Sequence, residues 1–409
     1  MQKLTCRLCK SIELYSFLDL GYSALADNFI NSSQLSESEI FYPLTVNFCK
    51  NCGFFQLSYV VPPEIMFNKD YPYDSSTTKT GREHFTLMAS DISEKYKFSP
   101  NSLVLDIGSN AGVLLSGFKT KEFRVLGIDP SSRVADIAIK NGIETIVDFF
   151  SLESASKILQ KYGECSIITA TNVFAHIDDL DEFMIAIKKL LAHDGILVIE
   201  APYLVNLIEN LEYDTVYHEH LSYISLKPLI AFFKKFNLEI FNVEMQSIHG
   251  GTMRYFIGKK DQHKKTENVS KYLQIENEKE IYTEAKLKLF SKKVHQHRQE
   301  LMNLLYDIKK QNKTIVGISS PAKGNTLLNF CKIGPELLNY VTERNPLKIN
   351  KFTPGMHIPV NSDDELLKNI PDYALILAWN FSEEIIKNNL DYQKKGGKFI
   401  IPIPKPKII

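Results

Sequence analysis

The chain has 409 residues, enough for two or three domains. Its 48 Lys and Arg residues balance its 48 Asp and Glu residues, so no net electric field attracts it to nucleic acid or to a membrane surface. No apolar run is long enough to span a bilayer, and residues 1–6 lack the pattern of a signal peptide. We expect a soluble cytoplasmic protein, a monomer or simple homo-oligomer, without nucleic-acid or membrane partners.

Four of the six cysteines form two C-x-x-C pairs, Cys6 with Cys9 and Cys49 with Cys52. Two such pairs can supply four thiolates to a tetrahedral zinc ion. The alternatives are two disulfides, which a reducing cytosol disfavours, or a redox C-x-x-C, which needs only one pair. Because four cysteine ligands leave no open position on the metal, the pattern predicts a structural Zn²⁺ site rather than a catalytic one.

The most informative motif is LVLDIGSNAG at residues 103–112, an apolar run followed by two glycines four residues apart. Glycines here allow a tight turn and the close approach of a ligand to the backbone. A dinucleotide site would instead show G-x-G-x-x-G. The D-x-G-x-x-x-G spacing resembles the first motif of class I S-adenosylmethionine (SAM) methyltransferases. We predict a SAM site that contains Asp106, Gly108, Asn110, Gly112, Asp129, Asp148 and Asn172. Asp129, at the end of the second strand, is placed to hold ribose hydroxyls.

Apolar strands alternate with amphipathic helical patterns from residue 103 to about 258, which predicts a mainly parallel, doubly wound α/β sheet. The predicted strands are 103–106, 124–128, 166–170, 196–200 and 238–243, and a helix is predicted at 181–192. A second α/β unit begins at 313–318, with further strands at 339–343, 373–378 and 398–402. We predict a zinc-binding domain (1–70), a Rossmann-like SAM-binding domain (71–261), a helical connector (262–312) and a carboxyl-terminal Rossmann-like α/β domain (313–409).

Residues 216–223, VYHEHLSY, concentrate groups that can move a proton. Histidine suits proton abstraction beside a carbonyl, and a neighbouring carboxylate could raise its basicity and fix its ring. A zinc protease would need H-E-x-x-H, with both histidines on one helix face. Because His218 and His220 are only two residues apart, that reading fits poorly. The remaining alternative to a catalytic segment is a polar turn crowded with aromatic side chains.

Two further segments follow predicted strands, where open α/β sheets bind ligands. In residues 171–179, His176 could donate a hydrogen bond to a developing oxyanion, and Asp178 or Asp179 could cap the next helix. In residues 319–326, backbone amides, hydroxyls and Lys323 suit a phosphate, although the order is not that of a nucleotide-hydrolysing loop. An ordinary glycine-containing turn is the alternative there.

Taken together, these motifs resemble those of the sugar C-methyltransferases of deoxysugar biosynthesis, and the likeness covers nearly the whole chain. It depends on the paired C-x-x-C motifs and on seven further segments in the same order: residues 106–112, 172–179, 217–223, 320–326, 344–346, 354–359 and 378–380. Family members join a zinc-binding domain, a SAM-binding domain and a Rossmann-like domain. The chain differs slightly, since the family often has an acid where Ala111 lies and Glu in place of Asp106 and Asp129.

The resemblance implies roles for individual residues. His220 matches the proposed general base, and the other predicted catalytic residues are Tyr217, Glu219, His176 and Tyr71. Predicted substrate-binding residues are Tyr73, Asn172, Lys323, Asn325 and Arg344.

The implied reaction is SAM-dependent methylation of a nucleotide-linked 4-keto-deoxysugar, at C3 of a dTDP-linked sugar or alternatively at C5, through an enolate. The rival readings are O- or N-methylation of a sugar nucleotide and a non-catalytic zinc-containing binding protein. An oxidoreductase is disfavoured because the second α/β unit has no full G-x-G-x-x-G.

Overall fold

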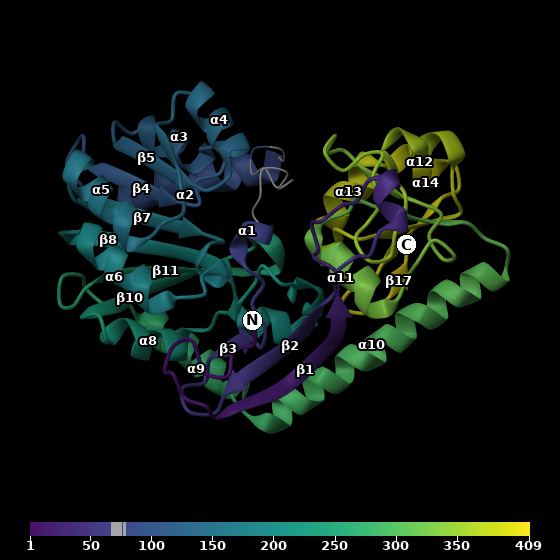
Figure 1. Cartoon of the computed structure of the whole chain (residues 1–409), viewed down its shortest axis with the longest axis horizontal. Helices are drawn as coiled ribbons and strands as arrows, with labels where there is room; N and C mark the ends of the chain where they lie inside the picture. Colours follow the sequence, from purple (N-terminus) through teal and green to yellow (C-terminus); the bar gives the residue numbers. More distant parts are fainter. Residues whose placement is uncertain (67–75, 77–78) are drawn as a thin grey trace.

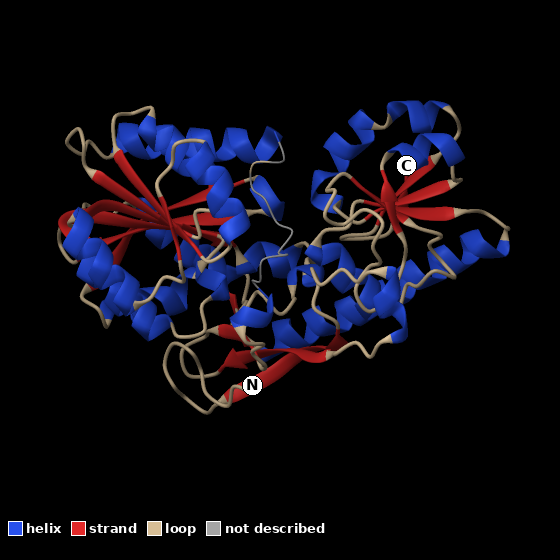
Figure 2. Ribbon diagram, turned by 45° about the horizontal axis from the view of Figure 1, so that its top comes forward, coloured by secondary structure: helices blue, strands red, loops and turns tan. Residues whose placement is uncertain are grey.

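The computed structural model describes residues 1–66, 76 and 79–409. Two α/β lobes face each other, and an antiparallel sheet and a long helix join them at one end (Figure 1). Figure 2 shows helices on both faces of the sheet in each lobe. Tyr71, predicted to be catalytic, and Tyr73, predicted to bind the substrate, lie outside the described residues.

The first lobe contains a seven-stranded sheet in the order β10-β11-β8-β7-β4-β5-β6. The five strands from β8 to β6 are parallel, whereas β11 is antiparallel to β8 and β10 is antiparallel to β11. Central strands are buried on both faces, which accounts for their continuous apolar sequence. The strands are β4 (Leu103–Ile107), β5 (Arg124–Asp129), β6 (Thr145–Val147), β7 (Cys165–Thr171), β8 (Leu191–Pro202), β10 (Leu238–Gln246) and β11 (Thr252–Lys259).

The predicted doubly wound, mainly parallel sheet is therefore confirmed, but β6 and β11 were not among the predicted strands. The lobe's helices are α2 (Lys79–Lys95), α3 (Val113–Lys119), α4 (Ser132–Lys140), α5 (Leu152–Tyr162), α6 (Leu180–Leu190), α7 (Leu204–Glu209) and α8 (Leu226–Lys234), with short 3₁₀ turns η2 (Phe174–His176), η3 (Tyr213–Thr215) and η4 (Ile248–Gly250).

The joining sheet has the order β1-β2-β3-β9, with β1 (Leu14–Ser23), β2 (Tyr42–Cys49), β3 (Phe55–Leu57) and β9 (Ser222–Tyr223). Its last strand directly follows the VYHEHL segment, so β3 of the amino-terminal region pairs with the two residues that come next after the candidate catalytic segment. The turn η1 (Ser32–Ser36) lies between β1 and β2, and α1 (Pro63–Met66) follows β3.

The segment between β1 and β2 contacts the second α/β lobe, which contains residues 315–408. Ala26 accepts a hydrogen bond from the Asn325 amide (2.7 Å), Ile30 forms a β-bridge with Phe352, and Glu39 accepts from the His357 imidazole (2.8 Å). The amino-terminal residues therefore contact both sides of the space between the lobes.

The second lobe has a six-stranded sheet in the order β14-β13-β12-β15-β16-β17, parallel except for β17. Its strands are β12 (Ile315–Ile318), β13 (Val341–Glu343), β14 (Val360–Ser362), β15 (Tyr373–Ile376), β16 (Lys398–Ile401) and β17 (Lys407–Ile408). Its helices are α11 (Ala322–Cys331), α12 (Asp364–Asn369), α13 (Ser382–Asn388) and α14 (Leu390–Lys394), with the 3₁₀ turn η5 (Trp379–Phe381).

A helix pair connects the lobes, α9 (Glu267–Glu278) and the 27-residue α10 (Glu284–Lys310). Seven side chains on α10 are buried at helical spacing, from Leu287 to Ile308, and the remaining charged face is solvated. Among the described residues, no helix combines the length and apolar character needed to cross a membrane.

Candidate active site

A cavity of about 1300 Å³ lies between the two lobes. Its walls come from the carboxyl ends of β4, β5 and β7, from residues 215–221, and from the loops after β12 and β13. The predicted site residues that line it are Asp106, Gly108, Asn110, Asp129, Asn172, His176, Tyr217, Glu219, His220, Lys323 and Arg344. Gly112, Asp148 and Asn325 are not among its lining residues. One space thus collects most of the predicted cofactor, catalytic and substrate residues.

The glycine loop is shaped by three positive φ angles, at Gly108, Asn110 and Gly112, and by one carboxylate. Gly108 has φ +66°, and a Cβ added there would lie 2.4 Å from the Val173 Cγ2 atom. Asp129 accepts hydrogen bonds from the backbone N–H groups of Asn110 and Ser131, both at 2.9 Å. The loop backbone is therefore held open beside Asp129, which fits a nucleoside ligand whose ribose hydroxyls bond to that carboxylate.

Replacing Gly108 by Ala is expected to damage this loop. The added methyl meets Val173 and the left-handed backbone is disfavoured, so we expect loss of stability and weaker SAM binding, by about 1–3 kcal/mol each. Gly21→Ala is the matched control, because Gly21 has φ +77° with no described atom within 4 Å of the added Cβ. Calorimetric titration with SAM, alongside urea unfolding, checks this. Equal SAM affinity in both variants would contradict it.

Asp106 is buried below the glycine loop, with 2% of its surface exposed. The pKa of Asp106 is raised to about 7, chiefly by burial and also by the nearby Asp129 carboxylate, against the lowering effect of a 2.6 Å hydrogen bond from the Thr169 hydroxyl. A carboxyl group with a raised folded-state pKa binds its proton more tightly in the folded than in the unfolded chain. The resulting stability is present below pH 4 and is lost as the pH rises through 7.

The Asp106→Asn variant is therefore expected to be more stable than the wild type at pH 8, by about 1–4 kcal/mol at roughly 1.4 kcal/mol per pKa unit. The difference should shrink toward pH 5, where the wild-type carboxyl is protonated. Urea unfolding of both proteins from pH 5 to pH 8 measures it. Asp136→Asn, at an exposed position on α4, is the control. A pH-independent difference would contradict the assignment.

His220 is oriented by the backbone rather than by a carboxylate. Its Nδ1 lies 2.8 Å from the carbonyl oxygen of Thr215, and because a carbonyl oxygen only accepts, Nδ1 carries the proton. Nε2 then presents a lone pair. The pKa of His220 is lowered to about 4, chiefly by burial and also by the Lys323 charge, against the raising effect of the hydrogen bond to Thr215, so the ring is neutral at pH 7. The expectation that a neighbouring carboxylate raises this basicity is thus wrong, since desolvation dominates.

Two more rings surround His220. The ring centroid of Tyr217 lies 4.1 Å from that of His220, and the centroid of His176 lies 5.1 Å away. Burial, together with the nearby His220, holds the pKa of His176 well below its usual value. Both histidines are neutral near pH 7, so one can accept a proton while the other donates a hydrogen bond.

The aspartates after His176 have structural roles. Asp179 caps α6 by accepting from the Glu182 N–H (3.0 Å), as predicted. Asp178 pairs instead with Lys3 (2.7 Å) and Arg7 (3.3 Å) of the amino-terminal lobe. Arg7, only 4% exposed, also donates to the carbonyl oxygen of Leu221 (3.1 Å). Arg7 therefore links both histidine segments to the amino-terminal region that holds the four cysteines. No local sequence pattern indicated this role for Arg7.

On the second lobe, polar groups of two loops line the cavity, namely Ser319, Lys323, Glu343, Arg344 and Asn345. Glu343 was not predicted. Its carboxylate accepts from the backbone N–H groups of Ser320 (3.1 Å) and Arg344 (2.8 Å), much as Asp129 does in the first lobe. Glu343 could have been predicted from the sequence, because it is an acidic residue at the carboxyl end of a strand, where open α/β sheets bind ligands.

Asn325 is fully buried, and its amide group is bonded inside the protein, to Ala26 and to the Ser320 hydroxyl (3.3 Å). Its position fits a structural residue that holds the segment after β1 against α11. Gly112 packs its left-handed backbone against Ala138 and Ile143, and Asp148 is exposed at the end of β6.

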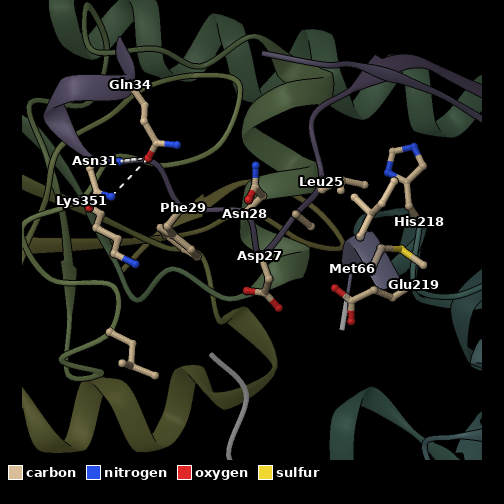
Figure 3. A pocket seen from close by; sticks show the side chains of 13 residues that line it. Leu25, Asp27, Asn28, Phe29, Asn31, Gln34, Met66, His218, Glu219 and Lys351 are labelled. Carbon is tan, nitrogen blue, oxygen red and sulfur yellow. Dashed lines mark hydrogen bonds between the residues drawn. The ribbon is translucent and has the colours of Figure 1, made fainter. Parts of the chain in front are cut away.

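A smaller cavity of about 200 Å³ adjoins the large one and shares Asp27, Met66 and Glu219 with it. Figure 3 shows its lining, which combines the segment after β1 with His218, Glu219 and Lys351. Asp27 also pairs with the Lys348 ammonium (3.3 Å) of the second lobe. The amino-terminal segment thus contributes polar side chains to the space between the lobes, which its sequence did not indicate.

The four predicted zinc ligands lie together, with all sulfur atoms within 4.8 Å of one another. The Sγ atoms of Cys6 and Cys52, and of Cys9 and Cys49, are 3.5 Å apart. Ligands about 2.3 Å from a tetrahedral zinc ion are separated by roughly 3.8 Å. The donor set and spacing therefore fit one structural Zn²⁺.

Comparison with known proteins agrees with these features. Three family models match: "Putative zinc binding domain" (residues 6–67), "Methyltransferase domain" (82–243) and "C-methyltransferase C-terminal domain" (247–404). C-methyltransferase NovU of Streptomyces niveus is 32% identical over 405 residues, 99% of this chain and 96% of NovU. A ubiquinone biosynthesis O-methyltransferase of Rickettsia bellii is 25% identical over 26% of this chain and 47% of its own.

Among solved structures, magnesium protoporphyrin IX methyltransferase from Synechocystis with bound SAH matches with TM-score 0.36 and 14% identity, covering 46% of this chain and 90% of that one. The plantazolicin methyltransferase BpumL matches with TM-score 0.36 and 15% identity, covering 46% and 88%. The match to NovU extends over the zinc-binding, methyltransferase and carboxyl-terminal regions alike. The chain therefore belongs to the family of SAM-dependent C-methyltransferases that carry an amino-terminal zinc-binding domain.

Proposed function

We propose that this C-methyltransferase acts on C3 of a nucleotide-linked 4-keto-deoxysugar, with His220 as the base that removes the C3 proton. The observation that carries the proposal is the neutral His220 ring, whose Nδ1–H is bonded to the Thr215 carbonyl, so that Nε2 carries the lone pair that can accept a proton. This ring lines the same cavity as the glycine loop and the polar loops of the second lobe.

The chemistry follows from the position of the ketone. A carbonyl at C4 acidifies the proton on C3. A base can therefore remove that proton, and an enolate forms. The electron pair of the C3–H bond moves toward the C4 oxygen while the proton goes to Nε2 of His220. The Thr215 carbonyl stabilises the imidazolium that forms, because it accepts from Nδ1–H throughout.

The cofactor and the substrate are assigned to opposite walls. SAM, when bound, supplies an electrophilic methyl group, and Asp106, Gly108, Asn110, Asp129 and Asn172 are the residues assigned to hold it. On the facing wall, Ser319, Arg344 and Asn345 offer cationic and hydrogen-bonding groups suited to a nucleoside diphosphate. We assign dTDP as that nucleotide part and, because four reduced thiolates suit a reducing compartment, the cytoplasm as the location.

The division into domains at residues 70, 261 and 312 also belongs to this proposal. The helix pair α9 and α10 separates the two lobes, while the sheet shared by β3 and β9 joins the first 70 residues to the methyltransferase lobe.

The test uses SAM labelled with ¹³C in the methyl group and a dTDP-linked 4-keto-deoxysugar. Carbon-detected NMR correlations of the product locate the new methyl group. The expected result is a ¹³C–¹³C or long-range ¹H–¹³C connection to C3. A methyl group bound to oxygen or nitrogen, or a correlation to C5, would overturn the assignment.

A further inference from the structure

The three-residue turn η3 connects His220 to the second lobe. Thr215, its last residue, accepts from His220 Nδ1, as described. Asp214, its middle residue, is 0% exposed and accepts from the Trp379 indole N–H at 2.6 Å. Because adjacent residues of one turn contact the base and a residue of the opposite lobe, the turn fixes the distance between them.

Lys323 completes this arrangement. Its Nζ lies 4.9 Å from the centroid of the Trp379 ring, and Lys323 lines the main cavity. Within the described part of the chain, this buried ammonium has no hydrogen-bond partner, and neither has the Oδ1 atom of Asp214. A buried, unpaired ammonium is costly unless something offsets it, and a substrate oxygen would supply the missing partner.

The reaction itself requires a cation near the base. A neutral imidazole whose pKa is lowered to about 4 is a weak base for a carbon acid. Proton removal then depends on stabilising the negative charge that develops on the carbonyl oxygen. The Lys323 charge acts at the His220 ring, since it contributes to lowering the pKa of that ring. His220 and Lys323 also line the same cavity, so the ammonium and the base can both reach one bound substrate.

Resting on the proposed function, we propose that Lys323 donates a hydrogen bond to the carbonyl oxygen of the substrate as His220 removes the adjacent proton. Asp214 and Trp379 are positioning residues that hold Lys323 there, Trp379 through its ring and Asp214 through its charge and its bond to the indole. The C–H electron pair ends as an enolate oxyanion paired with the ammonium. Lys323 keeps its proton, and the proton from carbon goes to His220.

The test measures exchange of the C3 proton with D₂O by NMR, with SAH bound so that methyl transfer does not occur. Lys323→Met is expected to slow exchange at saturating substrate by about 10²–10³-fold. Its affinity for dTDP should stay within about twofold of the wild-type value. Lys332→Met, at the exposed end of the same helix, is the matched control and should exchange normally.

The opposite pattern would overturn the inference. If Lys323 binds the diphosphate instead, the Lys323→Met variant loses dTDP affinity while exchange at saturation is unchanged. If the wild type exchanges no C3 proton at all, the proposed function fails. If the wild type and Lys323→Met exchange equally fast, only the role of Lys323 fails.

Asp214 is tested through its coupling to Lys323. Asp214→Asn keeps an acceptor for the Trp379 indole but removes the charge, so exchange should slow by about tenfold in the wild-type background. In the Lys323→Met background the same substitution should have little further effect. Additive losses would show that Asp214 acts independently of Lys323 and would contradict its positioning role, and thermal unfolding of each variant shows whether that variant is folded.

Discussion

Replacing His220 by Asn is expected to abolish methyl transfer while SAM still binds nearly as tightly as to the wild type. An amide can donate to the Thr215 carbonyl as the imidazole does, but it does not accept a proton from carbon. Loss of a general base costs on the order of 10²–10⁴ in rate. The measurement is SAH formation with saturating keto-sugar nucleotide, together with SAM titration calorimetry.

The matched control is His218→Asn, two residues away in the same segment. His218 is 2% exposed, its ring lies against Tyr42, and it lines only the smaller cavity. We expect this variant to retain most of its turnover even if its stability falls. If His220→Asn turns over within a few-fold of the wild type, or if His218→Asn is the inactive variant, the base is assigned wrongly.

Removal of zinc is expected to unfold the amino-terminal region and to abolish most of the activity. Arg7 lies between the zinc ligands Cys6 and Cys9, and it holds Leu221 beside the base and Asp178 beside His176. Apparent zinc-binding free energies of small domains are about 10–16 kcal/mol, so the metal-free lobe should unfold and release these contacts. We expect at least about a 100-fold loss of turnover.

Titration with a chelator, followed by metal analysis, thermal unfolding and turnover on the same samples, measures this effect. One zinc per chain should leave the protein as activity falls. The same chelator loaded with zinc beforehand serves as the control. Metal-free protein that keeps its melting temperature and turnover would contradict the role of Arg7 as a link between the metal site and the cavity.

Much of the fold was predictable because its signals are local. The run Leu103–Ile107 is buried on both faces and apolar except for Asp106, and the glycines after it allow the positive φ angles of the loop. Strand β6 is only three residues long, and β11 directly follows the glycine pair Gly250 and Gly251, which weakens the local strand signal. Short strands and antiparallel additions depend on pairing with a neighbour, which no single segment encodes.

In the candidate site, too, the features with a local sequence signal were predictable and those that depend on distant residues were not. Residues His176, His220 and Lys323 were predicted because chemistry-bearing side chains gather just after strands or within one short segment. Their partners were not, since Thr215 acts through a backbone carbonyl and Trp379 bonds to Asp214 across 165 positions of sequence. Contacts of that range arise from tertiary packing.

Solvent exchange at the sugar carbon tests the central claim most directly. Wild-type protein with bound SAH and a dTDP-linked 4-keto-deoxysugar is incubated in D₂O, and the C3 proton signal is followed by NMR. We predict loss of that signal with the wild type and its retention with His220→Asn. Retention of the C3 proton by active wild-type enzyme, or equal exchange by both proteins, would contradict proton removal by His220.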